Sequence, residues 1–311
     1  MRVLVTGGSG FLGAWVIKHL VEAGHEPLVF DVVGDRSKVA EIAGQRVARD
    51  LVWVVGDIRR LSDVEIAAQD CDAIVHLAGV LTPTCQQSPV LGAEINLLGT
   101  LNVFEVARKQ GIGSIAYAST AGVFGPHDNR QPLPETHYGA FKLACEGSAR
   151  AYWHDAGIAS VGFRPFVVYG PGRDSGLSAG PSLACRAAAL GEAYVLPFSG
   201  RCGLVYVADA AALFACAALQ RHEGARVFNL IGEEASVEDV IAGIRTIVPD
   251  ARLSSTGPAL PISVGQDEAD LDLCFPGMAR TSLADGLRET VRFYQRQPFP
   301  AADRAGCGLA A

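Results

Sequence analysis

The sequence lacks a surplus of positive charge. Its 311 residues carry 26 Lys and Arg against 33 Asp and Glu, which gives a formal net charge of -7. A protein that binds nucleic acid needs basic side chains to neutralise phosphates, so this composition predicts no nucleic-acid partner. Hydrophobic residues make up 49% of the chain, enough to bury one large core or two fused ones.

The sequence also lacks closely spaced metal ligands and long apolar runs. It has 8 cysteines, but no C-x-x-C pair and no Cys/His cluster with the spacing of a metal site. We therefore expect no metal, and thiols that are reduced and buried. No apolar run approaches the length of a membrane span, and the first residues lack the charged start and cleavage site of a signal peptide. These absences predict a cytoplasmic protein without a membrane partner.

The first half of the chain alternates short β-rich segments with helical ones. Such alternation is typical of βαβ units, in which helices cover both faces of a parallel sheet. We therefore predict an α/β fold with a Rossmann-type, doubly wound parallel sheet. The expected strands are residues 2–7, 26–32, 51–57, 72–79, 114–120 and 159–170.

The pattern changes after residue 164, where the segment 164–181 is crowded with Gly, Pro and Ser. We expect a smaller, mixed α/β part that binds the substrate. The predicted division is a dinucleotide-binding domain over 1–164, a substrate-binding part over 165–297 that is interleaved with it, and a tail over 298–311. Helices are expected at 181–191, 208–221, 236–247 and 281–296, with strands near 194, 204 and 227.

The first predicted βα junction reads VTGGSGFLG and places Gly7, Gly10 and Gly13 at G-x-x-G-x-x-G spacing. The first glycine permits a sharp turn, the second lets the backbone approach a pyrophosphate, and the third lets the helix pack closely on the strand. Free amides at the start of the helix would face the anion. The context of strand, loop, helix and second strand predicts a dinucleotide site.

Asp31 closes the next predicted strand, about two dozen residues beyond Gly7. A carboxylate at this place accepts hydrogen bonds from the ribose hydroxyls on the adenine side and repels a 2′-phosphate. The pattern therefore favours NAD over NADP. NADP stays open as an alternative, because Arg36 and Lys38 lie nearby and could receive that phosphate.

Tyr138 and Lys142 are four residues apart on a predicted helix, so their side chains share one face. An ammonium about 4 Å from the phenol would contribute roughly 4 kcal/mol at an effective dielectric near 20. That interaction could lower the pKa of the phenol by up to about three units, before desolvation offsets part of it. Ser119 and Thr120 end a predicted strand at the sheet edge where α/β folds bind ligands. The pattern predicts a proton-transfer site.

These segments together resemble the extended short-chain dehydrogenase/reductase family, in its NAD-dependent epimerase/dehydratase branch. The resemblance runs through nearly the whole chain. Its motifs are TGGSGFLG, GDI at 56–58, HLAG at 76–79, INLLGTLNVFEVAR at 95–108, YASTAGVFG, YGAFK, RPFVVYGPG, VYVADAA at 205–211 and TSLADGLRETVRFY at 281–294.

The resemblance implies roles for individual residues. Tyr138 would be the acid/base, Lys142 would lower its pKa and hold the nicotinamide ribose, and Thr120 would be the catalytic hydroxyl. Asn96 would support the active-site helix and its water. The remaining residues expected to bind the cofactor are Phe11, Leu12, Asp57, Ile58, Leu77, Ala78, Gly79 and Pro165.

The chain also departs from the family pattern. Ala121 follows Thr120 where dehydratases that act on nucleotide-sugars carry an acidic residue. Val167 and Cys202 stand where many nucleotide-sugar enzymes have an asparagine and an arginine that bind the diphosphate. Three other arginines, at positions 173, 201 and 280, could compensate, but the obvious diphosphate clamp is missing.

The predicted function is hydride transfer between NAD and a secondary alcohol of a polar, sugar-like substrate, such as a sugar, lactone or sugar acid. The alternatives are a redox-neutral epimerase acting on a nucleotide-sugar and a non-catalytic dinucleotide sensor or scaffold. Apolar stripes on segments 93–111 and 138–157 suggest a homodimer that pairs these helices. The expected substrate contacts are Thr82, Ser119, Thr120, His127, Arg164 and Arg173.

Overall fold

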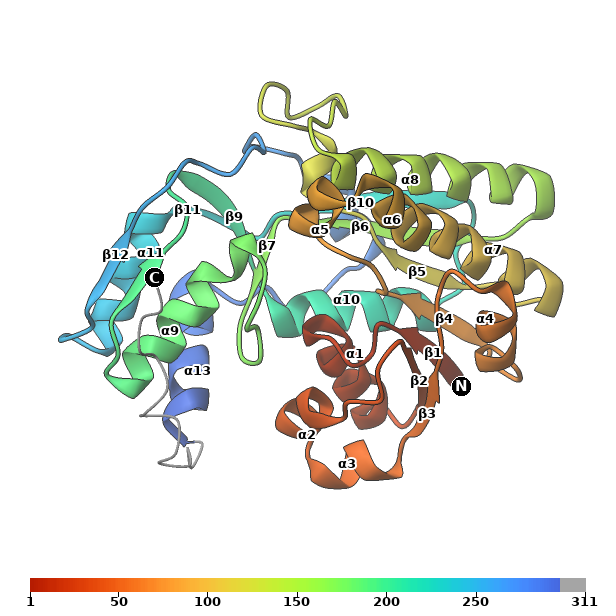
Figure 1. The fold of residues 1–311 in the computed structure, drawn as a ribbon, viewed down its shortest axis with the longest axis horizontal. Coiled ribbons are helices and arrows are strands. Elements are labelled where there is room, and N and C mark those ends of the chain that lie inside the picture. Colours follow the sequence, from red (N-terminus) through yellow and green to blue (C-terminus); the bar gives the residue numbers. More distant parts are fainter. Residues whose placement is uncertain (297–311) are drawn as a thin grey trace.

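A seven-stranded parallel sheet forms the centre of the larger part of the protein, as the computed structural model of residues 1–296 shows (Figure 1). The strand order β10-β6-β5-β4-β1-β2-β3 runs outward from β1 in both directions, which is the topology of a doubly wound sheet. The predicted Rossmann-type fold is therefore confirmed. The strands are β1 (Arg2–Thr6), β2 (Glu26–Asp31), β3 (Val52–Val55), β4 (Ala73–His76), β5 (Ile115–Ala118), β6 (Ser160–Pro165) and β10 (Ala225–Leu230).

Helices cover both faces of this sheet. Strand β1 shows the consequence, since Val3 and Val5 belong to the core on one face while Leu4 belongs to the core on the other. Side chains alternate along a strand, so a sheet that is buried on both faces needs continuous apolar strands. The first face carries α1 (Phe11–Glu22), α2 (Ser37–Ala43), α3 (Gln45–Asp50) and α10 (Val207–Leu219). The second carries α4 (Leu61–Ala67), α5 (Thr82–Gln87), α6 (Pro89–Ala93), a π-helical turn (Glu94–Leu98), α7 (Gly99–Gln110) and α8 (His137–Ala156).

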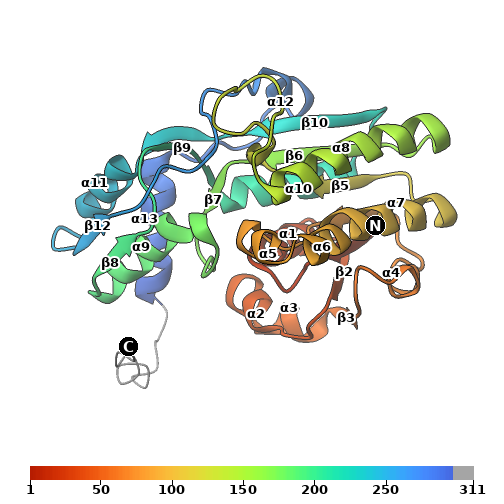
Figure 2. The same ribbon diagram turned by 45° about the horizontal axis from the view of Figure 1, so that its top comes forward.

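The smaller part contains a three-stranded mixed sheet and a two-stranded parallel sheet, with helices packed around them (Figure 2). Strand order is β11-β9-β7 in one sheet and β12-β8 in the other. The predicted helices after residue 180 are present within a few residues of their expected ends. The elements are β7 (Val167–Tyr169), α9 (Gly180–Leu190), β8 (Tyr194–Leu196), β9 (Arg201–Tyr206), β11 (Glu233–Ser236), α11 (Val237–Ile247), β12 (Leu253–Ser255) and α13 (Leu283–Arg296). Helix α12 (Ala269–Cys274) packs instead against β10 of the large sheet.

The chain crosses between the two parts more than once. β6 belongs to the large sheet and β7 to a small one, with Phe166 between them. The chain then returns to the large sheet with α10 and β10 before it enters the small part again. The expected domain boundary at residue 164 falls at the end of β6 and stays a prediction, and the predicted tail lies outside the described residues.

The helical stretch 89–110 is long and apolar enough to cross a membrane by length and composition, and within the described part of the chain it is the one such stretch. Its C-terminal half, α7, buries Val103, Phe104, Val106 and Ala107 in the core beside the large sheet. Packing inside the fold accounts for these apolar residues.

Candidate active site

A cavity of about 670 Å³ lies at the edge of the large sheet where β1, β4, β5 and β6 end. The carboxyl ends of parallel strands meet at this edge, which is where open α/β sheets bind ligands. The cavity extends from the glycine-rich loop to the loop after β7 in the smaller part. The predicted residues that line it are Gly7, Gly10, Phe11, Leu12, Gly13, Leu77, Gly79, Thr82, Ser119, Thr120, Tyr138, Lys142, Pro165 and Arg173.

The glycine-rich loop is built so tightly that side chains would not fit. Gly7 has a φ of +71°, and a Cβ on it would lie 2.7 Å from the backbone nitrogen of Ala78. A Cβ on Gly13 would lie 2.5 Å from the carbonyl oxygen of Gly7. Gly10 precedes α1, and the first residues of this helix line the cavity. The loop therefore fits the pyrophosphate of a dinucleotide, with free helix amides beside the anion.

Asp31, at the end of β2, holds the glycine-rich loop in place. Its carboxylate accepts hydrogen bonds from the backbone nitrogens of Ser9, at 3.0 Å, and Val32, at 2.8 Å. The two nearby cations already have partners. Arg36 donates to the carbonyl oxygens of residues 48 and 49, and Lys38 forms an ion pair of 2.7 Å with Asp174. This arrangement leaves neither cation dedicated to a 2′-phosphate, in agreement with the preference for NAD.

The first two turns of α8 carry Tyr138 and Lys142. Thr136 caps the helix by accepting a hydrogen bond of 3.0 Å from the backbone nitrogen of Gly139. A Cβ on Gly139 would lie 2.5 Å from the carbonyl oxygen of Gly122, so this glycine lets α8 approach the turn after β5. Thr120 begins that turn. The close approach brings Thr120, Tyr138 and Lys142 to one cavity, as predicted.

Burial dominates the electrostatics of this group. It raises the pKa of the Tyr138 phenol well above its ordinary value, and the positive charge that opposes this rise is that of Arg173. Burial also lowers the pKa of Lys142, whose Nζ lies 5.9 Å from the centre of the Tyr138 ring. The predicted net fall in the pKa of Tyr138 is therefore wrong, because desolvation of the phenolate outweighs the opposing positive charge, and that charge belongs to Arg173 and not to Lys142.

Ser119 and Arg164 do not point a free polar group at the substrate. The Ser119 hydroxyl donates to Glu146 Oε1 at 2.6 Å, and Arg164 binds both oxygens of the same carboxylate at 2.8 and 2.6 Å. Glu146 is fully buried in α8. Arg164 does not line the cavity, so the prediction that it contacts substrate is corrected. It neutralises a buried carboxylate instead.

His127 is also placed away from the cavity lining. Its side chain is 76% exposed and lies 3.2 Å from Glu135. The predicted substrate contact is therefore not made in this structure, because the loop that carries His127 turns outward into solvent. A histidine in an exposed loop gives no sequence signal that would have revealed this orientation.

Besides Asp31, four predicted cofactor residues lie outside the cavity lining. Asn96 is fully buried, and its amide binds both backbone groups of Val80 at 3.0 and 3.1 Å. Ala78 donates its backbone hydrogen to the Thr6 hydroxyl at 3.2 Å.

Asp57 forms an ion pair with the neighbouring Arg59, and Ile58 is buried against Gly99. Asn96 therefore shapes the wall after β4, and the contacts expected of Asp57 and Ile58 stay predictions.

Sequence reasoning missed an apolar wall on the substrate side of the cavity. Its members come from four separate loops or strand ends, and no motif connects them. The segment 260–262 reaches the cavity because the loop that follows it is bonded to the loop after β5, through Ser263 and Gly125. The wall consists of Val80, Leu81, Pro83, Phe166, Val167, Val168, Leu177, Leu260, Pro261 and Ile262.

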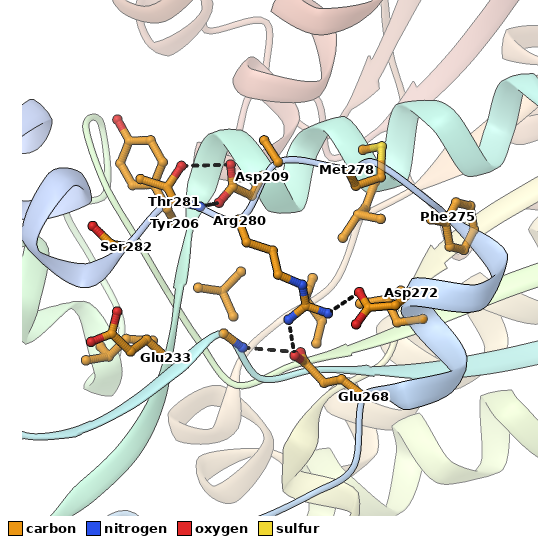
Figure 3. A pocket seen from close by; sticks show the side chains of 17 residues that line it. Tyr206, Asp209, Glu233, Glu268, Asp272, Phe275, Met278, Arg280, Thr281 and Ser282 are labelled. Atoms are coloured by element: carbon orange, nitrogen blue, oxygen red, sulfur yellow. Dashed lines mark hydrogen bonds and ion pairs between the residues drawn. The ribbon is translucent and has the colours of Figure 1, made fainter.

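The expected substitutes for a diphosphate clamp are scattered. Arg201 donates to the carbonyl oxygen of Glu234 at 3.0 Å and does not line the main cavity. Arg280 lies in a second cavity of about 340 Å³, where it forms ion pairs with Glu268, at 2.6 Å, and Asp272, at 2.5 Å (Figure 3). The two cavities share no lining residue. Of the three arginines, Arg173 alone lines the main cavity.

A glycine-rich loop on a Rossmann-type sheet, with a Tyr–Lys pair beside it, defines a short-chain dehydrogenase/reductase. The profile described as NAD dependent epimerase/dehydratase family matches residues 3–231. The chain belongs to this family. Its members are enzymes that depend on NAD, which confirms the predicted family, the enzyme class and the cofactor.

Curated relatives include epimerases and a reductase. A putative UDP-glucose 4-epimerase of Methanocaldococcus jannaschii is 30% identical over 55% of this chain and 57% of its own length. UDP-glucose 4-epimerase 4 of Oryza sativa subsp. japonica is 34% identical over 49% of this chain and 45% of its own length. A 2-alkyl-3-oxoalkanoate reductase of Stenotrophomonas maltophilia is 31% identical over 55% of this chain and 52% of its own length. The chain thus matches about half the length of these relatives.

Solved structures match over almost the whole chain. The UDP-glucose 4-epimerase of Thermus thermophilus, solved as a complex with NAD, has a TM-score of 0.80 at 26% identity and covers 95% of this chain and 99% of its own. MoeE5, solved with UDP-glucose and NAD, has a TM-score of 0.81 at 25% identity with the same coverage. These neighbours share the large sheet and the smaller part.

The close packing at Gly13 predicts the effect of a single methyl group. We expect Gly13→Ala to weaken NAD binding by roughly tenfold or more, because the new Cβ would force the glycine-rich loop away from its position. Gly147→Ala is the matched control, since its Cβ would meet no atom nearer than 4.0 Å. Calorimetric titration with NAD checks both variants, and equal affinities would contradict the phosphate-loop assignment.

The buried carboxylate of Glu146 predicts a large stability effect for its partner. We expect Arg164→Met to lower the free energy of unfolding by about 3 to 5 kcal/mol, because it leaves a buried charge unpaired. Arg288→Met removes an exposed pair with Asp285 and should change stability by less than about 1 kcal/mol. Urea denaturation of both variants measures the difference. A small loss in Arg164→Met would show that Glu146 is not charged in the folded protein.

Proposed function

We propose that the protein is an NAD-dependent oxidoreductase that transfers a hydride at the secondary alcohol, or the corresponding ketone, of a small substrate. The observation that carries this proposal is that Tyr138 and Lys142 line the same cavity as the glycine-rich loop.

The chain offers a residue for each task of the reaction. Gly7, Gly10 and Gly13 would hold the pyrophosphate, and Asp31 would stand near the adenine-side ribose. Bound NAD supplies the acceptor for hydride from the substrate carbon. The hydroxyl of Thr120 would position the substrate oxygen. Tyr138 would exchange the proton of that oxygen, and Lys142 would keep a positive charge beside it.

The raised pKa of Tyr138 favours the protonated phenol at neutral pH. A protonated phenol is ready to donate to a carbonyl oxygen, so the protein is suited to the reduction of a ketone. One relative, the oxoalkanoate reductase of Stenotrophomonas maltophilia, is 31% identical in its matched segment, and its name describes a reduction of this type. This resemblance supports a reductase, with alcohol oxidation as its reverse.

A nucleotide-sugar 4-epimerase is the second candidate, and the similarity to the epimerases of Thermus thermophilus and Methanocaldococcus jannaschii favours it. The cavity offers no counterpart to the diphosphate clamp, because Val167 and the buried Cys202 replace its expected members. An epimerase returns the hydride to the substrate, so reduced cofactor does not accumulate. A dinucleotide sensor, the third candidate, would not need Tyr138 and Lys142 in the cavity.

We also propose that two copies of the chain pair through α7 and α8 in the cytoplasm. The two helices pack side by side, and Leu98, just before α7, is 50% exposed (Figure 1). In this proposal, a second copy of the chain would cover the outer surface of α7 and α8 together with Leu98.

Replacement of the phenol tests proton transfer. We expect Tyr138→Phe to reduce turnover by roughly a hundredfold or more, because no other group in the assignment exchanges the proton, while NAD affinity stays unchanged. Tyr194→Phe, on β8 outside the cavity lining, should behave like the unaltered protein. A screen of free sugars, hydroxy acids and nucleotide-sugars with NAD, read by NADH formation and product stereochemistry, supplies the substrate. Undiminished turnover in Tyr138→Phe would contradict the assignment.

The pKa of Tyr138 predicts opposite pH profiles for the two directions. Oxidation needs the phenolate, and burial raises the pKa of this group, so kcat for oxidation should rise by about tenfold per pH unit from pH 7 to 9. Reduction needs the phenol, which is the dominant form over this range, so kcat for reduction should stay flat. Stopped-flow measurement in both directions checks this. An oxidation rate that is already constant above pH 7 would show that the phenol ionises at a lower pH than its burial indicates.

A further inference from the structure

Arg173 is the feature of the main cavity that the proposed reaction leaves unexplained. It follows β7, and its loop is anchored on two sides. Trp15 Nε1 donates to the carbonyl oxygen of Pro171 at 3.0 Å, and the backbone nitrogen of Gly172 donates to the Tyr294 hydroxyl at 2.9 Å. These bonds hold the arginine in a fixed position before any ligand arrives.

The guanidinium has donors to spare. One nitrogen donates to the carbonyl oxygen of Val168 and the other to the Ser178 hydroxyl, the latter at 2.8 Å. A guanidinium has five N–H donors, so these two bonds leave three. The group also lies 5.9 Å from the centre of the Phe11 ring, which is the first residue of α1 in the cavity wall. The remaining N–H groups of Arg173 are therefore available to a ligand in the cavity.

Arg173 forms no salt bridge within the described residues, although the charge of the neighbouring Asp174 acts on it from a greater distance. No ion pair joins Arg173 to an acidic side chain in residues 1–296, and its neighbour Asp174 binds Lys38 at 2.7 Å. Burial lowers the pKa of Arg173 to about 10, which leaves it charged at neutral pH. Arg173 is partly buried, and a charge that is partly removed from water without an ion-pair partner is unfavourable, so an anionic ligand would stabilise this arrangement.

The rest of the substrate side limits that anion to a single charge. The cations in the cavity lining are Lys38, Lys142 and Arg173. Lys38 is paired with Asp174 and Glu41, and Lys142 belongs to the proton-transfer group. The surrounding wall is apolar. One free cation in an apolar wall suits a carboxylate with a short hydrocarbon part better than a diphosphate, which carries at least two charges.

We propose that Arg173 is the receptor for a substrate carboxylate, and that the substrate is a small hydroxy acid or oxo acid with an apolar tail. This inference rests on the proposed function and names its substrate class. Tyr138 and Arg173 line the same cavity, so a carboxylate bound to Arg173 would share that cavity with the group that Tyr138 protonates. The wall formed by Leu81, Phe166 and Ile262 receives the tail.

The reaction balances without a further reagent. In the oxidation of a hydroxy acid, the carbon–hydrogen bond breaks with transfer of hydride to NAD. The oxygen–hydrogen bond breaks with transfer of the proton to Tyr138, and a carbonyl group forms. The carboxylate bound to Arg173 does not change. The products are an oxo acid, NADH and one proton, and reduction of the oxo acid is the same step in reverse.

A binding experiment without turnover tests the carboxylate site. The full chain is saturated with NAD and titrated calorimetrically with butyrate and with butyramide, its uncharged counterpart. We expect butyrate to bind roughly tenfold or more tightly than butyramide, because a charge-assisted, forked hydrogen bond is lost in the amide. Arg173→Met should abolish this preference, and Arg173→Lys, which keeps the charge without the fork, should retain part of it.

Arg201→Met is the matched control, because Arg201 lies outside the cavity and should leave the preference unchanged. Binding of NAD shows which variants are folded. If Arg173→Met does not fold, Arg173→Lys tests the proposal, because its preference for butyrate over butyramide should be reduced. An unchanged preference in either folded Arg173 variant overturns the proposal. Uridine diphosphate binding more tightly than butyrate, in a manner that depends on Arg173, also overturns it in favour of a diphosphate site.

Turnover measurements separate this inference from the proposed function. If the preference for butyrate depends on Arg173 but no hydroxy acid yields NADH, the carboxylate site stands and the proposed reaction fails. If neutral secondary alcohols yield NADH as fast as hydroxy acids do, the reaction stands and the carboxylate site is overturned.

Discussion

The ion pair between Glu146 and Arg164 fixes the geometry on which the candidate active site depends. Glu146 lies on α8, Arg164 on β6, and the same carboxylate receives the hydroxyl of Ser119 at the end of β5. Tyr138, Lys142 and Glu146 follow one another at four-residue intervals, so they lie along one face of α8. The ion pair therefore sets how α8 lies on the sheet edge, and so where the phenol and the lysine meet the cavity.

Desolvation then sets the chemistry of the groups that this geometry brings together. Tyr138, Lys142 and Arg173 all have pKa values displaced toward the uncharged form by burial. The cavity thus brings a phenol that favours its protonated form together with the side chains of Lys142 and Arg173. A site of this kind gains most from ligands that bring negative charge, and the pyrophosphate of NAD and a carboxylate both meet that requirement.

The sequence allowed prediction of the parts of the site that depend on local rules. The glycine spacing at Gly7 and Gly13 and the four-residue spacing of Tyr138 and Lys142 report backbone geometry that one segment determines by itself. The wall formed by Leu81, Phe166 and Ile262 could not be predicted, because distant loops meet there only after folding. The role of Arg164 was missed for the same reason, since its partner Glu146 looks like any helical glutamate. The direction of the Tyr138 shift depends on burial, which no motif encodes.

The ion pair between Lys38 and Asp174 connects the two ends of the cavity. Lys38 belongs to α2, near the strand end that carries Asp31, whereas Asp174 directly follows Arg173. The side chain of Asp174 is 53% exposed, so the pair contributes about 1 kcal/mol or less. A link of this strength is weak enough to open in thermal motion, while the bonds of Pro171 and Gly172 still hold the backbone that precedes Asp174. The segment next to Asp31 and the segment that carries Arg173 thus meet at one half-exposed contact, whose opening would widen the cavity without unfolding either segment.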